Sequence, residues 1–498
     1  MKKIILKNSI VSLALQLINI GMNFLIRYLL IKYIGVEWLG INATLTSLLS
    51  TFSLAELGIS SVICFYLYGP IREENNAEIN HIINIYRVLY KFIGGIFLTA
   101  SLLSGFFIPH ILTGVAITSG IYAVYFILVI TSASTYFLAY RRILLEADQK
   151  QYVAKITDIF FELLCGVIQI ILLVRLKNYV LFLTVNVFKL IGTNLFVYRK
   201  CGRIYPFLDI QKCKSGELLK TVKGMKDVFC IQIASYVYGS TDNLIISIFT
   251  STVYVGYLSN YSMISNTIKS IVRSIMYPLT PIIGNIVAKG SANNEKVFHL
   301  CTLAGYALSG MFCIPIIVLT QTFISNIFGY AYLLSIVIPI LMVGDIALDI
   351  IQIPCCAFIK GSGLFRYENF TCIIGAVTNI LFSLILVQKY GMAGVLGGTV
   401  LSQAVFFVLR SIVIFKYCIQ EKVKEKAVGY YCASVKFFVN FILSSVICWG
   451  IYQLIGNVSF IPRFLCGGIL CEIVFFLLFA AFWNKDVKDA LKIFLRAR

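Results

Sequence analysis

Apolar residues in this chain form long runs that are separated by short polar stretches. Fourteen of the runs reach the length of a membrane-spanning helix, about 20 residues. They cover residues 8–33, 40–67, 84–108, 117–140, 153–174, 179–198, 228–249, 253–276, 298–321, 332–358, 368–387, 393–416, 433–455 and 463–483. The runs are continuous rather than alternating, which is typical of helices and not of the strands of a membrane barrel. The pattern predicts an all-α integral membrane protein with about 14 transmembrane helices.

Composition narrows the function classes. Hydrophobic residues make up 59% of the 498 residues and charged residues only 13%. These values exclude a soluble enzyme, a disordered chain and, despite a net charge of +20, a soluble nucleic-acid binder. No stretch between the runs is long enough for a folded domain of about 50 residues, so any function must lie within the helices. No nucleotide-binding P-loop pattern is present.

The fifteen cysteines lie mostly inside the apolar runs, and the chain has only three histidines. We therefore interpret the cysteines as reduced packing residues and predict neither a metal site nor a bound cofactor.

Lysine and arginine are distributed unevenly between alternate loops. Thirty-two of the 42 lie in loops on the side of the N-terminus, and five lie in loops on the other side. Cytoplasmic loops carry this excess in membrane proteins, so both termini are predicted to be cytoplasmic. The first apolar run is too long for a signal peptide and is interpreted as the first membrane helix.

Four of the predicted helices, the first, second, seventh and eighth, each carry a stripe of mostly polar residues spaced by three, four or seven positions, and each stripe includes a full charge. The stripes are Ser12, Gln16, Asn19, Asn23 and Arg27; Asn42, Thr46, Ser53, Glu56 and Ser60; Gln232, Ser235, Gly239 and Asp242; and Ser262, Asn266, Lys269 and Arg273. One interpretation is hydrogen bonding between packed helices. The other is a hydrated cavity lined by the four helices, whose slight excess of positive charge suits an anionic group such as a phosphate.

Other charges inside the apolar runs have several interpretations. Asp345 and Asp349 share one face of the tenth predicted helix, where they would bind a cation or proton, or cap a helix break. Asp158 and Glu162 are expected to reach water, and Arg410 to extend toward the inner interface. Lys189 and Glu472 have no assigned role, and a neighbouring helix is expected to supply their partners. The glycines between 391 and 398 are interpreted as sites of close helix packing.

Several segments resemble bacterial polysaccharide repeat-unit flippases, which belong to the multidrug/oligosaccharidyl-lipid/polysaccharide exporter superfamily. The segments are 28–35 with Trp38-Leu-Gly40, then 54–59, 140–150 and 240–247. The resemblance extends over nearly the whole chain. It implies two six-helix lobes in a V shape, with helices 1, 2, 7 and 8 lining the cavity. The parts would be an N-terminal lobe (1–200), a basic cytoplasmic linker (201–227), a C-terminal lobe (228–420) and an extra two-helix hairpin with a basic tail (421–498).

The resemblance implies a flippase rather than an enzyme. It would move undecaprenyl-pyrophosphate-linked oligosaccharides across the bacterial cytoplasmic membrane by alternating access, for O-antigen or capsule assembly. Its partners would be the lipid-linked oligosaccharide, the membrane, and the glycan polymerase and glycosyltransferases of the pathway, with no nucleic acid. The substrate-binding residues would be Arg27, Lys269, Arg273, Glu56, Asn19, Asn23 and Gln16. A coupling Na⁺ or H⁺ would bind at Asp242, Asn379 and Thr399.

Lys269 and Arg273 lie four residues apart, on one face of the eighth predicted helix. Burying two cations that close together without anions is costly. Either Glu56 or Asp242 neutralises one of them while the other extends inward past Pro278, or the two form a clamp for the pyrophosphate.

Three other functions remain open on the sequence. They are a flippase for the cell-wall precursor lipid II, a multidrug/cation antiporter and, from a different class, a membrane polysaccharide polymerase. An antiporter for cationic drugs favours an acidic cavity. A polymerase usually needs a large external loop, and the outer loops of this chain are short.

Overall fold

The computed structural model of the chain describes residues 2–53, 59–210, 239, 241–276, 283, 294–419, 423–455 and 459–484. Within these residues every regular element is a helix. The chain folds into two compact units, Met1–Gly256 and Tyr257–Arg498. The all-α membrane fold predicted from the apolar runs is confirmed.

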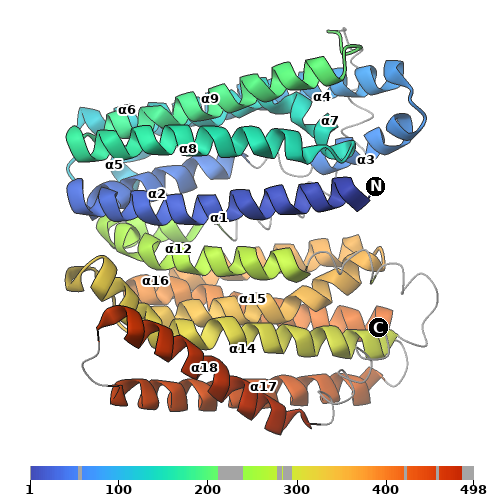
Figure 1. Cartoon of the computed structure of the whole chain (residues 1–498). Coiled ribbons are helices and arrows are strands. Elements are labelled where there is room, and N and C mark those ends of the chain that lie inside the picture. The colour runs from blue at the N-terminus through green and yellow to red at the C-terminus, as the bar shows by residue number, and fades with distance from the viewer. Residues whose placement is uncertain are drawn as a thin grey trace. The chain divides into compact units, whose positions relative to one another are not determined.

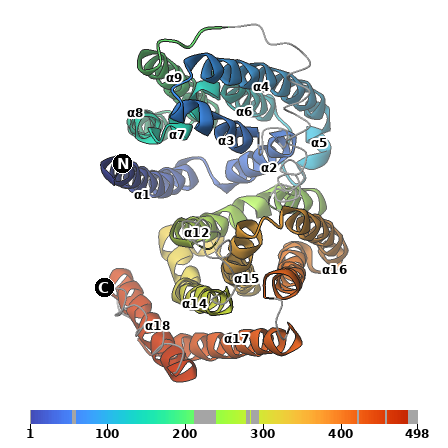
Figure 2. The same ribbon diagram turned by 90° about the vertical axis from the view of Figure 1, so that its right-hand side faces the viewer.

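The first unit is a bundle of long helices with shorter helices between them. They are α1 (Lys2–Tyr33), α2 (Val36–Phe52), α3 (Ile59–Arg72), α4 (Asn76–Ser104), α5 (Ile108–Ile111), α6 (Ser119–Leu138), α7 (Arg142–Ala147), α8 (Gln151–Arg175) and α9 (Tyr179–Ile204). α1 packs along α8, α8 along α9, and α9 along α6. The short α7 contacts α3 and α8. Figure 1 shows the long helices of this unit side by side, and Figure 2 looks along them.

Two of these helices begin at asparagine residues that close the helix end. The side chain of Asn75 accepts a hydrogen bond from the backbone N–H of Glu78 at 3.2 Å, at the start of α4. Asn178 does the same for the N–H of Leu181 at 3.1 Å, at the start of α9. Such caps satisfy N–H groups that have no partner inside the helix. The sequence therefore fixes where α4 and α9 begin.

The second unit is built around α15. Its helices are α14 (Asn294–Ile327), α15 (Val337–Gly361), α16 (Phe365–Val413), α17 (Val423–Leu454) and α18 (Phe460–Phe482), together with most of α12 (Thr252–Met276). α15 packs against α14 on one side and α16 on the other, and Ile346, Ile350 and Phe358 on it are fully buried. α17 and α18 pack against each other and against α14, and α18 lies obliquely in Figure 1.

α16 contains two antiparallel arms that fold back at Gly391. This glycine has a φ of 55°, which side chains other than glycine rarely adopt. Hydrogen bonds join the two arms at increasing distance from the turn. The hydroxyl of Ser383 donates to the carbonyl of Val395 at 3.3 Å, and the amide of Asn379 donates to the hydroxyl of Thr399 at 3.1 Å. The two arms correspond to the predicted helices 368–387 and 393–416.

The arms approach so closely that glycine is needed at the contact. A Cβ atom at Gly398 would lie 2.6 Å from the backbone nitrogen of Ser383, whereas one at Gly397 would meet nothing nearer than 3.9 Å. The interpretation of these glycines as sites of close packing is confirmed for Gly394 and Gly398 but not for Gly397. We expect Gly398→Ala to lower the midpoint of thermal unfolding, with a cost of about 1–3 kcal/mol for overpacking. Gly397→Ala is the matched control, and equal midpoints for the two variants would contradict the close contact.

Ten stretches within the described residues are long and apolar enough to cross a membrane, and one of them, Arg366–Cys418, contains both arms of α16. The predicted run 40–67 corresponds to α2 and α3, with residues 54–58 between them outside the described residues. The run 253–276 corresponds to α12, and this helix carries many polar residues. Most of the run 228–249 lies outside the described residues, as does most of the predicted linker 201–227.

Residues 241–256 belong to the first unit and contact its other residues, although the sequence assigns them to the second lobe. Asn243 donates to the hydroxyl of Ser47 at 3.0 Å, and the backbone N–H of Thr252 donates to the carbonyl of Thr113 at 2.9 Å. A Cβ atom at Gly256 would lie 2.4 Å from the carbonyl oxygen of Val36, so two backbones meet here. The boundaries of the four predicted parts stay predictions.

Candidate functional site

Two ion pairs join α12 to α15 in the second unit. The Nζ of Lys269 lies 2.6 Å from a carboxylate oxygen of Asp345, and an Nη of Arg273 lies 2.8 Å from one of Asp349. The two residues on each helix are four apart, which is one helical turn and about 6 Å along the axis. Since both residue numbers rise together, the two helices run in the same direction. We call these four residues the charge ladder.

The charge ladder corrects the expected partners of its cations. One of the two interpretations of the sequence gave Glu56 or Asp242 as the counter-charge of one of these cations, but each cation pairs with an aspartate of α15. Glu56 lies outside the described residues. The aspartates were interpreted as a cation site or as caps of a helix break. Each aspartate instead pairs with a cation on the adjacent helix, because an isolated charge in a low-dielectric interior is costly.

The two rungs of the charge ladder differ in exposure. The side chains of Lys269 and Asp345 are 16% and 18% exposed, whereas that of Arg273 is 42% exposed. A guanidinium presents five N–H donors in a planar fork, and Arg273 is the more exposed cation of the ladder. The Arg273 rung is therefore the part of the ladder at which an anionic group can be bound while the pair stays formed.

Hydrogen bonds connect the deeper rung to the far side of the unit. Gln403 donates to the second oxygen of Asp345 at 3.0 Å, and Gln352 donates to the side-chain oxygen of Gln403 at 3.0 Å. Arg410 donates to Gln352 at 2.9 Å and pairs with Glu368 at 2.8 Å. From Arg410 through Gln352 and Gln403, each side chain donates to the next one nearer to Asp345. Arg410 also donates to Glu368. A buried network of this kind holds α12, α15 and both arms of α16 in one arrangement.

The residues predicted to couple a cation lie in both units. Asn379 and Thr399 are buried, and the side-chain amide of Asn379 donates to the hydroxyl of Thr399 at 3.1 Å between the arms of α16. Asp242 is half-buried in the first unit. Oxygen atoms of a carboxylate, an amide and a hydroxyl are ligands that hard cations prefer.

The predicted stripe of the first helix lies on α1. Gln16, Asn19 and Arg27 are half-buried and Asn23 is exposed. Because α1 is one continuous helix, the spacing of three and four residues places these side chains on one face. Nothing in the described contacts assigns them a ligand, and their role in substrate binding stays a prediction.

Three further ion pairs involve charges that lie inside the predicted apolar runs. Lys189 of α9 pairs with Glu162 of α8 at 3.1 Å, and Asp158 of α8 pairs with Arg142. The expectation that Asp158 and Glu162 simply reach water was incomplete. Arg410 does not extend to the interface, because Glu368 and Gln352 bind it in the interior of the unit.

Sequence reasoning missed Gln352, Gln403 and Glu368. Neutral amides in an apolar run give little signal, since they also occur as simple contacts between helices. The sequence did contain a signal for the pairing within the charge ladder. Asp345 and Asp349 repeat the four-residue spacing of Lys269 and Arg273 with the opposite charge.

Neither a protein-family model nor a curated protein sequence matches this chain. Solved structures do match it. The lipid II flippase MurJ, in an inward closed conformation, has a TM-score of 0.65 and 16% sequence identity, and the match covers 97% of this chain and 100% of the flippase. An inward-facing multidrug resistance MATE family transporter of the MOP superfamily has a TM-score of 0.60 and 11% identity, with 83% of this chain and 99% of the transporter covered.

The MATE multidrug transporter DinF-BH is similar as well, with a TM-score of 0.55, 15% identity, and coverage of 82% of this chain and 95% of the transporter. The chain therefore has the fold of multi-span transporters of this superfamily. At these identities the likeness establishes the fold, and the function has to be argued from the residues.

Proposed function

We propose that this chain is a membrane flippase that acts by alternating access. Its substrate is an undecaprenyl-pyrophosphate-linked oligosaccharide, which it moves from the inner to the outer leaflet of the bacterial cytoplasmic membrane. The product serves the assembly of a surface polysaccharide such as O-antigen or capsule.

The observation that carries this proposal is the length of the match to the lipid II flippase. The 3% of this chain that the match leaves uncovered is too short to contain either α17 (32 residues) or α18 (23 residues). Matches to the multidrug transporters leave out 16–18% of the chain. A lipid-linked substrate has a long apolar tail, and an additional helix pair that packs on α14 extends the surface available to it.

The charge ladder supports an anionic substrate group. Arg273 is partly exposed and keeps its charge beside Asp349, and a guanidinium binds phosphate oxygens in bidentate fashion. In this proposal the pyrophosphate binds at Arg273. The ion pair between Lys269 and Asp345 forms the neighbouring, more buried rung of the ladder. Gln16, Asn19, Asn23 and Arg27 would meet other polar parts of the substrate.

A coupling ion completes the proposed cycle. We assign it as Na⁺ or H⁺ at Asp242, Asn379 and Thr399, which offer oxygen ligands. The excess of Lys and Arg on one side favours cytoplasmic termini, where the glycosyltransferases that build the substrate act. The glycan polymerase would act on the translocated product.

Deleting the gene in its own host tests the proposal. The expected result is loss of one surface glycan and accumulation of its lipid-linked precursor with the sugars facing the cytoplasm. Normal surface glycans, with no accumulated precursor, would contradict the proposal.

The match to the lipid II flippase favours one second candidate, which is transport of lipid II itself. Expression of this chain in cells depleted of their own lipid II flippase separates the two. Rescue of growth would assign lipid II as the substrate, whereas we expect no rescue if the substrate is a surface-glycan precursor.

A further inference from the structure

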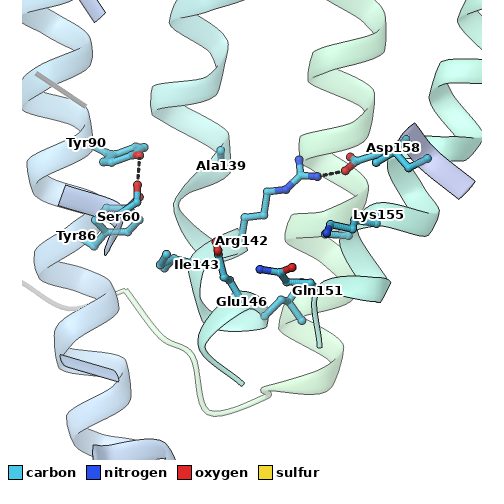
Figure 3. Close-up of a pocket in the computed structure, with 13 residues that line it drawn as sticks. Ser60, Tyr86, Tyr90, Ala139, Arg142, Ile143, Glu146, Gln151, Lys155 and Asp158 are labelled. Carbon is cyan, nitrogen blue, oxygen red and sulfur yellow. Dashed lines mark hydrogen bonds and ion pairs between the residues drawn. The ribbon is translucent and has the colours of Figure 1, made fainter. Parts of the chain in front are cut away.

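A cavity of about 450 Å³ lies inside the first unit, among α1, α3, α4, α7 and α8 (Figure 3). Ligand pockets in proteins usually measure about 300–1,000 Å³. The polar residues that line it are Ser60, Tyr86, Tyr90, Arg142, Glu146, Gln151, Lys155 and Asp158. None of them belongs to the charge ladder or to the predicted cation site, so the cavity is a separate candidate site.

One wall of the cavity is a cluster of hydroxyl groups on aromatic rings. The hydroxyl of Ser60 lies 2.8 Å from that of Tyr86 and 3.0 Å from that of Tyr90. The centroids of the two tyrosine rings are 4.2 Å apart. Hydroxyl groups both donate and accept hydrogen bonds, so this wall suits a ligand that does the same.

The opposite wall carries balanced charge. Arg142 pairs with Asp158, and the Nζ of Lys155 donates to the hydroxyl of Ser12 on α1 at 2.7 Å. Glu146 and Gln151 complete the wall. Two cations and two carboxylates line the cavity, and Figure 3 shows Arg142 in contact with Asp158.

Contacts outside the cavity hold this wall in place. Asp148, between α7 and α8, accepts a hydrogen bond from Tyr205 and lies 2.6 Å from the Nζ of Lys150. Burial raises the pKa of the Tyr205 phenol, so it stays protonated and keeps donating. The segment that joins α7 to α8 is held at this point, and a wall that is already fixed loses less conformational entropy when a ligand binds.

The chemistry of the walls disfavours most ligand classes. The two cations and two carboxylates of the lining give the cavity no net charge to favour either a phosphate or an organic cation. An apolar ligand would bury these polar groups without hydrogen bonds, which is costly. A sugar is uncharged, and its hydroxyl groups can donate to the carboxylates and accept from the cations and amides.

We infer that this cavity binds a sugar residue of the lipid-linked substrate. The inference rests on the proposed function and adds to it, because it places sugar recognition inside one unit, apart from the pyrophosphate. Arg142 and Lys155 lie in the part of the chain that the charge pattern assigns to the cytoplasmic side. Recognition therefore occurs before translocation and selects the glycan that is loaded.

Binding measurements on the purified full-length protein in lipid nanodiscs test this inference. One probe is the lipid-linked oligosaccharide extracted from cells that lack the gene, and the other is undecaprenyl pyrophosphate without sugar. We expect the wild-type protein to bind the sugar-bearing lipid more tightly. Tyr90→Phe and Gln151→Ala should each weaken that binding by up to about tenfold, the equivalent of one hydrogen bond, and leave binding of the bare lipid unchanged.

Tyr122→Phe, on α6 and away from the cavity lining, is the matched control and should bind both lipids as the wild type does. Gln151→Trp, which fills the cavity from its edge, should remove the preference for the sugar-bearing lipid. Unchanged preference in all three cavity variants, with normal binding by the wild type, would overturn the sugar site alone. Failure of the wild type to bind either lipid would overturn the proposed function, and the sugar site with it.

Discussion

Arg410→Ala is expected to destabilise the second unit by about 3–5 kcal/mol, the usual cost of removing one partner from a buried ion pair. The carboxylate of Glu368 is only 2% exposed, and its charge is balanced by Arg410, which is 13% exposed. The two residues lie near opposite ends of α16, so the pair ties the two arms together at the end away from the Gly391 turn.

The measurement is the midpoint of thermal unfolding of the purified protein, together with the fraction that elutes as a single species. Arg366→Ala is the matched control, because Arg366 lies in the first turn of the same helix but is exposed. Replacing both partners with leucine should recover much of the loss, since no buried charge is then left without a partner. A midpoint for Arg410→Ala equal to that of Arg366→Ala would contradict the assigned role.

Arg273→Ala is expected to lower the transport rate by about tenfold to a hundredfold, with little loss of protein. A hydrogen bond to a charged group contributes about 1.5–3 kcal/mol, and about 1.4 kcal/mol corresponds to a factor of ten. Arg273→Lys should recover only part of the rate. It restores the charge and the pair with Asp349 but cannot form the planar fork that binds two phosphate oxygens.

The initial rate of lipid movement in vesicles, at matched protein content, measures this effect. Lys389→Ala serves as the control, since Lys389 is exposed near the turn of α16 and outside the charge ladder. Full transport by Arg273→Ala would limit Arg273 to its ion pair with Asp349. Equal rates for Arg273→Lys and the wild type would show that charge alone is needed.

Much of the fold could be predicted because a membrane-spanning helix needs a long apolar run, and a run of that length is visible without any knowledge of its neighbours. The two arms of α16 were located in this way, and the glycines between 391 and 398 indicated how they meet. The residues that contact each other across helices were harder to predict. Periodicity shows which face a side chain occupies but not which helix lies opposite.

The charge ladder illustrates that limit. The spacing of Lys269 and Arg273 correctly placed them on one face of α12, but their partners depend on α15 being adjacent, which no local pattern indicates. Arg410 is a second case. Its position near the end of an apolar run favoured extension to the interface, yet Glu368 lies beside it only because α16 folds back on itself.

The most direct test of the account is lipid movement in vesicles that contain the purified protein and no other. The lipid-linked oligosaccharide is labelled on its sugar with a fluorophore, and dithionite outside the vesicles destroys only the fluorophores in the outer leaflet. The account predicts that the protein makes nearly all of the labelled lipid accessible, whereas about half stays protected in protein-free vesicles. Equal protection in the two preparations, while the same vesicles transport a cationic dye such as ethidium, would contradict a flippase and assign the chain to drug export.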